Sequence, residues 1–201
     1  MTRLFAIAAA LATTTALAAG VYFAFFHTSV SQCSGTTIAG GEAAIGGPFT
    51  LVDQTGRTVT DKDVITDLSL VYFGYTFCPD VCPIDTARNV EVVDLAAEQG
   101  LKVTPVFITI DPARDTVAAL ADYAEVMHED MIALTGSDEQ VAAASRAYKT
   151  YYRKNGEGED YLMDHSTFTY LMAPDGFLDF FRRDATPSEM VETIACYAAE
   201  R

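Results

Sequence analysis

The sequence predicts an α/β domain, a sandwich of helices around one mixed β-sheet, preceded by a single N-terminal transmembrane helix. Two observations support this fold class. Beyond Pro48, apolar runs typical of strands alternate with segments in which apolar residues recur at helical spacing. Ahead of these elements, Leu4 to Phe26 is a run of 23 residues without a charge. The chain therefore divides into a membrane segment and one folded domain.

The composition excludes several classes of protein. Half of the 201 residues are hydrophobic and 20% are charged, which excludes a disordered chain. There are 13 Lys and Arg residues against 28 Asp and Glu residues, so the net charge is −15 and the isoelectric point is near 4.3. This charge argues against nucleic acid as a partner, because binding to phosphates needs the opposite sign. It favours cations and basic proteins.

The uncharged N-terminal run is long enough to cross a membrane. As a helix it would measure about 35 Å, at about 1.5 Å per residue, against a hydrocarbon core of about 30 Å. The alternative is a secretory signal cleaved after Ala16-Leu17-Ala18, but the apolar residues continue to Phe26 and end in an aromatic cluster suited to a membrane interface. Arg3, the only flanking basic residue, leaves the N-terminus in the cytoplasm. We therefore expect a membrane anchor at residues 1–27, a flexible Ser-, Thr- and Gly-rich tether at 28–46, and a domain at 47–201 in an extracytoplasmic compartment, where thiols can be oxidised.

The first half of the domain is predicted to hold a hairpin and two central strands that flank a helix. Residues 49–52 and 57–60 are the expected hairpin strands, around the turn Asp53-Gln54-Thr55-Gly56. Residues 68–75 (LSLVYFGY) form a continuous apolar run typical of a buried central strand, and residues 102–110 (KVTPVFITI) form a second one. Between them, residues 83–99 carry apolar side chains at helical spacing, with Gly100 as the cap.

The second half is predicted to continue the alternation. A helix over residues 115–127 is followed by a short strand over 131–134. Ser137 begins a further helix, with the capping sequence S-D-E-Q, and this helix is expected to run through Tyr152.

A hairpin and a helix are expected to complete the domain. Residues 168–172 and 177–181 flank the turn Ala173-Pro174-Asp175-Gly176, and Thr186-Pro187 begins the last helix, where proline is tolerated in the first turn. This order of elements is compatible with a thioredoxin-like sandwich around a mixed central sheet.

Two cysteines mark the candidate site, in the sequence Phe77-Cys78-Pro79-Asp80-Val81-Cys82-Pro83 between the first central strand and its helix. Thiols four residues apart at the start of a helix lie on one face, with their β-carbons about 5–6 Å apart. Such a pair can close to a disulfide or bind one metal ion, and a helix N-terminus stabilises the thiolate that either reaction needs. An inert buried pair or a structural bridge is the alternative. We favour a site because strand-to-helix turns are where α/β sheets place their sites, and the three-residue spacer favours a chelate.

The segment from Val71 to Pro83 (VYFGYTFCPDVCP) closely resembles the signature of the SCO/SenC family. These are membrane-anchored, thioredoxin-fold copper proteins that assist assembly of the CuA centre of cytochrome c oxidase. Three further segments are similar to that family: residues 47–53 (GPFTLVD) with Gly56, residues 107–112 (FITIDP) with 114–116 (RDT), and residues 164–166 (DHS). The resemblance extends over residues 46 to 197, which is essentially the whole predicted domain.

The resemblance implies a ligand set. In the family, the two motif cysteines and one distant histidine bind a single copper ion, and these positions correspond to Cys78, Cys82 and His165. Two thiolates and an imidazole suit Cu(I) and Cu(II) and would also accept Zn(II), so coordination chemistry alone does not choose the metal. The resemblance selects copper.

The other polar residues near these positions have simpler interpretations. His27 abuts the membrane segment, and His128 lies at a predicted helix end, where a solvated cap accounts for it. His165 is expected in a loop just before a strand. Asp80 and Asp164 neighbour the implied ligands, either as supporting groups or as solvated charges.

Three further groups of residues have simpler explanations than a role in copper chemistry. Cys33 and Cys196 could pair in an oxidising compartment, although the sequence does not show that they meet, and Cys196 could equally be a small core side chain. Core packing rather than a copper relay explains the methionines at positions 127, 131, 163 and 172. A solvated helix end, rather than a docking patch, explains the cluster Tyr148, Lys149, Tyr151, Tyr152, Arg153 and Lys154.

Two functions of different classes follow from this interpretation. The first is a membrane-anchored copper metallochaperone with its domain in the periplasm, held by the cytoplasmic (inner) membrane, whose partners are the CuA-bearing subunit of cytochrome c oxidase and other copper chaperones. The alternative is an enzyme, a thiol–disulfide oxidoreductase that uses Cys78 and Cys82 to reduce cysteines of the oxidase subunit or of another protein. A third and weaker hypothesis is a peroxidase, because some thioredoxin-fold proteins reduce peroxides with one cysteine of low pKa. The three-residue spacer and His165 favour the chaperone.

Overall fold

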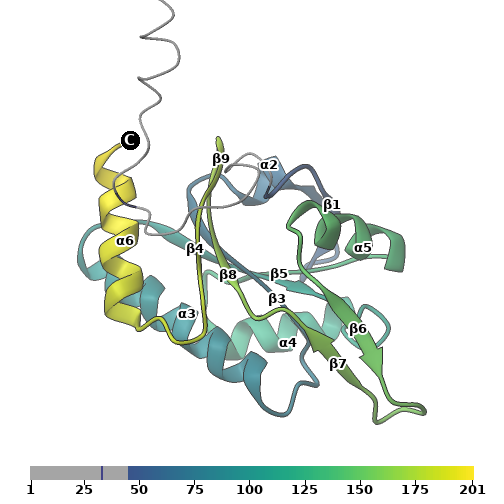
Figure 1. Cartoon of the computed structure of the whole chain (residues 1–201). Helices are drawn as coiled ribbons and strands as arrows, with labels where there is room; N and C mark the ends of the chain where they lie inside the picture. Colours follow the sequence, from purple (N-terminus) through teal and green to yellow (C-terminus); the bar gives the residue numbers. More distant parts are fainter. Residues whose placement is uncertain (1–32, 34–44) are drawn as a thin grey trace, which may run out of the picture. The chain divides into compact units, whose positions relative to one another are not determined.

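A seven-stranded mixed sheet forms the centre of the computed structural model, which describes Cys33 and residues 45–201 (Figure 1). The strands are β1 (Thr50–Asp53), β2 (Thr58–Thr60), β3 (Leu68–Gly74), β4 (Val103–Thr109), β5 (Ile132–Thr135), β6 (Tyr152–Asn155), β7 (Leu162–His165), β8 (Thr169–Ala173) and β9 (Gly176–Phe181). The helices are α2 (Asp61–Val64), α3 (Val81–Glu98), α4 (Val117–Met127), α5 (Asp138–Ala147) and α6 (Pro187–Ala199).

The order in the main sheet is β2-β1-β5-β4-β3-β8-β9. The pairs β3–β4 and β4–β5 are parallel, whereas the pairs β1–β2, β1–β5, β3–β8 and β8–β9 are antiparallel. The predicted mixed sheet is therefore confirmed, and the two apolar runs expected at its centre are β3 and β4. Both are buried on both faces, as a strand covered by helices on each side must be.

Helices cover the two faces of the sheet. Tyr72 of β3 faces α3, where its hydroxyl donates to Asp85 at 3.1 Å. The next residue, Phe73, points to the opposite face and packs against Tyr148, just beyond α5, with ring centroids 5.2 Å apart. Helices α3 and α6 pack together on the Tyr72 side (Figure 1). The Cys78–Cys82 segment thus leaves the end of a central strand and enters a helix packed against the sheet.

The predicted helix from Ser137 is shorter than expected. Its capping box is present, but α5 ends at Ala147, and the expectation that it reaches Tyr152 is wrong. The chain turns sharply there: Lys149 has a φ of 55°, and the Ser145 hydroxyl donates to the carbonyl of Thr150 at 2.9 Å. Tyr148 is fully buried, so the interpretation of this region as a solvated helix end fails for that residue.

The segment after this turn forms a hairpin that the sequence pattern did not predict. Strand β6 pairs with β7 in a separate two-stranded sheet, with Tyr152 opposite His165 and Asn155 opposite Leu162. Polar and charged side chains dominate β6, which lacks the apolar alternation by which strands are recognised. His165 is consequently the last residue of a strand and not part of a loop.

The predicted role of the methionines in packing is confirmed. Met131 and Met172 are buried in the core, and Met127 and Met163 pack against it.

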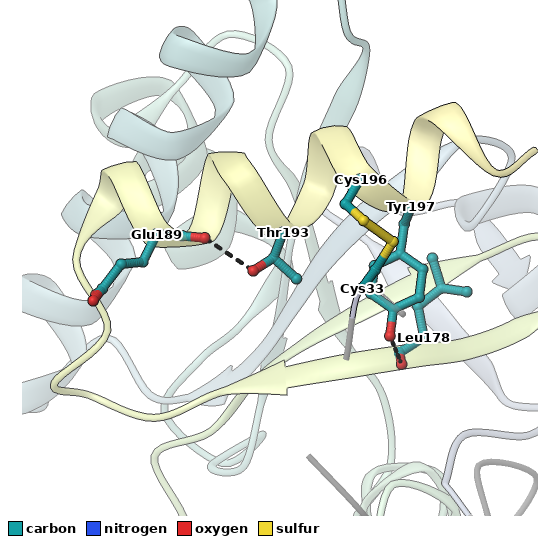
Figure 2. The surroundings of a disulfide bond; sticks show 6 residues. All are labelled: Cys33, Leu178, Glu189, Thr193, Cys196 and Tyr197. Carbon is teal, nitrogen blue, oxygen red and sulfur yellow. Dashed lines mark hydrogen bonds between the residues drawn. A yellow bond between two sulfur atoms is a disulfide. The ribbon is translucent and has the colours of Figure 1, made fainter. Parts of the chain in front are cut away.

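A disulfide joins Cys33, in the predicted tether, to Cys196 of α6 (Figure 2). This pairing, which the sequence left open, brings together residues 163 positions apart. Beside it, the hydroxyl of Tyr197 donates to the carbonyl of Leu178 at 2.9 Å and ties α6 to the beginning of β9. Strand β8 pairs with both β9 and β3, so this part of β9 lies at the same end of the sheet as Ser69, near the beginning of β3. Since Cys78 and Cys82 follow the end of β3, the disulfide lies at the opposite end of the sheet.

Within Cys33 and residues 45–201, no helix combines the length and the apolar character needed to span a membrane. The predicted anchor at residues 1–27 lies outside the described residues, as does the predicted tether apart from Cys33, Ile45 and Gly46.

Candidate metal centre

The loop between β3 and α3 positions the two cysteines. After Gly74 ends β3, the amide of Cys78 donates to the carbonyl of Tyr75 at 3.2 Å and turns the chain. Helix α3 begins at Val81, two residues earlier than expected, so Cys82 lies in its first turn. Pro83 occupies the same turn, where the amide that it lacks would have no partner within the helix. The amide of Cys82 donates to the sulfur of Cys78 at 3.3 Å, so the start of the helix directs a backbone donor at that sulfur.

Gly74 makes room for the second cysteine. A β-carbon at position 74 would lie 3.2 Å from the sulfur of Cys82, 3.0 Å from the ring of Phe107 and 2.8 Å from the ring of Tyr72. The Cys82 side chain is 1% exposed and lies directly over the strand. A glycine is thus required at the end of β3 for this sulfur to reach the site.

His165 reaches the cysteines from the β6–β7 hairpin. Its Nδ1 lies 2.8 Å from the carbonyl oxygen of Ser166, which can only accept, so Nδ1 carries the proton. Nε2 is then the nitrogen with a free lone pair, and it lies 3.3 Å from the sulfur of Cys82. The rings of Tyr72 and Tyr75 lie edge-on to the imidazole, with centroids 6.2 and 6.0 Å away, and hold its orientation.

The structure therefore brings Cys78, Cys82 and His165 together. Their two sulfurs and one ring nitrogen all lie within 4.8 Å of one another, with both cysteines buried and unpaired and the histidine half-buried. The donor set of two thiols and an imidazole with a free lone pair fits a soft or borderline metal ion. The ligand atoms of Cys33, Cys196 and Glu200 also lie within 4.8 Å of one another, but the two sulfurs are joined in the disulfide.

The three groups differ in their ionisation. Burial alone would raise the pKa of the Cys78 thiol, but hydrogen bonds from the amides of Cys82, Asp80 and Val81 outweigh it and hold the pKa below its ordinary value. Burial raises the pKa of Cys82 far above the ordinary value, and the neighbouring Cys78 adds to this rise. Burial lowers the pKa of His165, which favours the neutral, metal-binding form of the ring. The Cys78 thiol therefore loses its proton more readily than the Cys82 thiol, and the imidazole of His165 favours its neutral form.

A buried polar cluster supports the centre from the side of α3. Asp85 is 2% exposed, accepts from the Tyr72 hydroxyl at 3.1 Å and pairs with Arg183 at 3.2 Å. Neither residue was predicted from the sequence pattern. Asp85 follows Cys82 by three residues on one helix face, a spacing that could have pointed to it, whereas Arg183 is close only in the folded chain.

Asp80 and Asp164 occupy less central positions than the ligands they adjoin. Asp80 is the N-cap residue of α3, with an exposed side chain. The carboxylate of Asp164 accepts from Arg153 and from Asn155 of β6, each at 3.1 Å, so it braces the hairpin. His128 is the C-cap residue of α4, as expected, but its side chain is only 14% exposed and lies 3.4 Å from Asp94 rather than in solvent.

Comparison with known proteins decides the family. A family model described as SCO1/SenC matches residues 38–199. The chain belongs to the SCO1/SenC family. Protein SenC of Rhodobacter capsulatus is 57% identical over 157 residues, which cover 77% of this chain and 71% of that protein. The human mitochondrial SCO1 homolog is 42% identical over 162 residues, which cover 78% of this chain and 54% of that protein.

Solved structures of this family share the fold. Arabidopsis thaliana ScoI with copper bound is similar with a TM-score of 0.76 and 37% identity, over 79% of this chain and 100% of that one. Bradyrhizobium japonicum ScoI with copper bound gives a TM-score of 0.68 and 38% identity, over 77% of this chain and 99% of that one. The predicted thioredoxin-like sandwich is thereby confirmed for the described domain.

Proposed function

We propose that this SCO1/SenC protein binds one copper ion through Cys78, Cys82 and His165 and delivers it during assembly of the CuA centre of cytochrome c oxidase. The observation that carries the proposal is the convergence of two unpaired sulfurs and one imidazole nitrogen within 4.8 Å at the end of the central strand. Relatives with 37% and 38% identity have been solved with copper bound, which supports copper over zinc.

The chemistry of loading follows from the ionisation of the three groups. The lowered pKa of Cys78 makes its thiolate easier to form, and the lowered pKa of His165 favours the neutral ring, whose free nitrogen can bind metal. Cys82 has to release its proton on binding, because only the thiolate is a good ligand. Three protein donors leave room for a donor of the acceptor protein, and the copper ion can then pass by exchange of one ligand at a time.

We further propose that residues 1–27 anchor the protein in the cytoplasmic membrane with its domain in the periplasm. The 23-residue uncharged run supports this topology, and the Cys33–Cys196 disulfide is consistent with an oxidising compartment. The full-length protein should remain in the membrane fraction after extraction with alkaline carbonate. Release by carbonate, or a mature N-terminus near Ala19, would replace the anchor with a cleaved signal.

Metal analysis of the reduced, detergent-solubilised protein tests the copper site. One equivalent of copper is expected, and none after oxidation to a Cys78–Cys82 disulfide. Changing His165→Ala should weaken Cu(II) most, because Cu(I) can persist on two thiolates. The matched variant His128→Ala, at the end of α4, should bind like the wild type. Tight binding of one equivalent by the oxidised protein would refute the ligand set.

Thiol–disulfide reduction is the second candidate function, and the lowered pKa of Cys78 favours it. Changing His165 distinguishes the two functions, because this residue can bind metal but cannot carry electrons to a disulfide. Loss of CuA under limiting copper in cells carrying His165→Ala, together with its loss in cells carrying Cys78→Ser and in cells carrying Cys82→Ser, supports copper delivery. Full oxidase assembly with His165→Ala, and failure only with the cysteine variants, would identify the protein as a reductase.

A further inference from the structure

A groove of about 650 Å³ lies beside the candidate metal centre and is not used by the three ligands. Three segments line it: the loop that carries the cysteines, the turn after β4, and residues 158–162 of the β6–β7 hairpin. Phe77 on one wall directly precedes Cys78, and Leu162 on the other begins the strand that ends in His165. A molecule seated in the groove therefore touches both segments from which the ligands come.

The walls of the groove carry exposed apolar side chains. Phe77 is 57% exposed and Leu162 is 47% exposed. Among the residues that the structure describes, only five large hydrophobic side chains are exposed, and two of the five line this groove. Apolar side chains gathered in a concave surface are typical of a binding site.

The base of the groove is held in place without a ligand. The guanidinium of Arg114 lies 3.6 Å from the ring centroid of Tyr161 and 4.8 Å from that of Phe77. Arg114 also pairs with Asp111 and donates to the carbonyl of Tyr161 at 3.0 Å, while the Tyr161 hydroxyl donates to Asp111 at 2.6 Å. A site that is already formed loses little conformational entropy when a partner binds.

The rim of the groove is acidic. Glu159 and Asp160 line it, Glu157 precedes them in the exposed hairpin loop, and the exposed Asp80 follows Pro79 on the opposite wall. Arg114, the basic residue that lines the groove, pairs with Asp111, and Lys154 of β6 lies over the ring of Tyr161, with its nitrogen 3.8 Å from the centroid. Together with a net charge of −15 for the chain, this rim attracts a basic surface.

We propose that this groove is the docking surface for the copper acceptor, and that it binds a loop in which an apolar side chain is flanked by Lys or Arg. The apolar side chain lies between Phe77 and Leu162, and the basic residues face Glu159 and Asp160. This arrangement places the acceptor's copper ligands next to Cys78 and His165. The identity of the partner rests on the proposed function.

Binding of the copper-free CuA-bearing domain of the oxidase to the copper-free, full-length protein in detergent tests the docking surface. Leu162→Ser should raise the Kd at least about tenfold, because a central apolar contact is lost. Val126→Ser, which changes an 81% exposed side chain on α4, is the matched control and should leave the Kd unchanged. The double variant Glu159→Lys/Asp160→Lys should slow association and flatten its salt dependence, whereas Glu192→Lys on α6 should not.

A Kd for Leu162→Ser equal to that of the wild type would overturn the docking surface. An equal loss of affinity in Val126→Ser would also overturn it, as would a wild-type protein that does not bind the domain. Copper stoichiometry is measured separately, without the acceptor. A wild-type protein that binds the acceptor but no copper would contradict the proposed function while leaving the docking surface standing. Normal copper loading of Leu162→Ser, together with slowed transfer, supports both.

Discussion

At the scale of single residues, the two site cysteines are chemically different despite their proximity. The amides at the start of α3 point at the sulfur of Cys78, whereas Cys82 is buried over Gly74. The first sulfur is thereby stabilised as a thiolate and the second is kept as a thiol.

This difference predicts the order and the pH dependence of alkylation. Only a thiolate reacts with iodoacetamide, so the rate rises with pH through the thiol's pKa. Because the pKa of Cys78 lies below the ordinary 9.0, its rate should level off at a lower pH than that of a free cysteine. Cys82 should stay largely unmodified over the same range, because burial raises its pKa. Peptide mass spectrometry of the reduced protein between pH 6 and 10 measures both rates, and faster modification of Cys82 would contradict the assignment.

Gly74 offers a second test at this scale. In Gly74→Ala the new β-carbon would displace the sulfur of Cys82 and the ring of Tyr72, so we expect weaker copper binding and a loss of about 1–3 kcal/mol in the free energy of unfolding. Gly100→Ala is the control: its β-carbon would meet no atom within 4 Å, but its φ of 76° strains an alanine. The control should lose stability and keep its copper affinity. Unchanged copper affinity in Gly74→Ala would show that the sulfur does not depend on this glycine.

At the scale of elements, the β6–β7 hairpin decides whether the site is complete. It delivers His165, and it is held to the body of the domain by Arg114, Tyr161 and the hydroxyl of Tyr75, which accepts from the amide of Met163 at 3.2 Å. The sequence of β6 is polar, so apolar periodicity does not predict this hairpin. The turn at Lys149 carries no glycine that would predict the end of α5. Tertiary contacts therefore determine both the β6–β7 hairpin and the end of α5.

The hairpin's attachment predicts the effect of removing Arg114. In Arg114→Ala the contacts to Asp111 and to the Tyr161 carbonyl are lost, so His165 should be held less firmly. We expect the affinity for Cu(II) to fall by up to about tenfold, although the residue touches no ligand. Competition titration with a chelator measures the affinity. Arg201→Ala, which removes an ion pair with Asp175, is the control, and an equal effect in both variants would contradict a positioning role for Arg114.

At the scale of the whole molecule, the two sulfur pairs lie at opposite ends of the sheet. The Cys33–Cys196 disulfide lies near the beginnings of β3 and β9, whereas Cys78 and Cys82 follow the end of β3. The first pair connects the N-terminal segment to the last helix, and the second remains free to bind metal.

This separation predicts that stability and copper binding respond independently to loss of the disulfide. Cys33→Ser/Cys196→Ser should lower the free energy of unfolding by about 2–4 kcal/mol, because the bond closes a long loop in the unfolded chain. It should leave one equivalent of copper bound. Denaturant unfolding and metal analysis of the same preparation measure the two quantities, and loss of copper in this variant would contradict the separation.

The sequence by itself determined the features that depend on neighbouring residues. The apolar runs predicted β3 and β4, the capping residues predicted where α5 and α6 begin, and the spacing of Cys78 and Cys82 at a helix start predicted a chelating or redox pair. Tertiary structure alone decided what depends on distant residues. His165, one of three histidines, was selected by resemblance and is brought to Cys82 by the pairing of β7 with β6. Asp85 meets Arg183, and Cys33 meets Cys196, only once α3, α6 and the sheet have packed. The physical reason is range: periodicity and caps act over a few residues, whereas strand pairing and helix packing join positions that the linear order keeps apart.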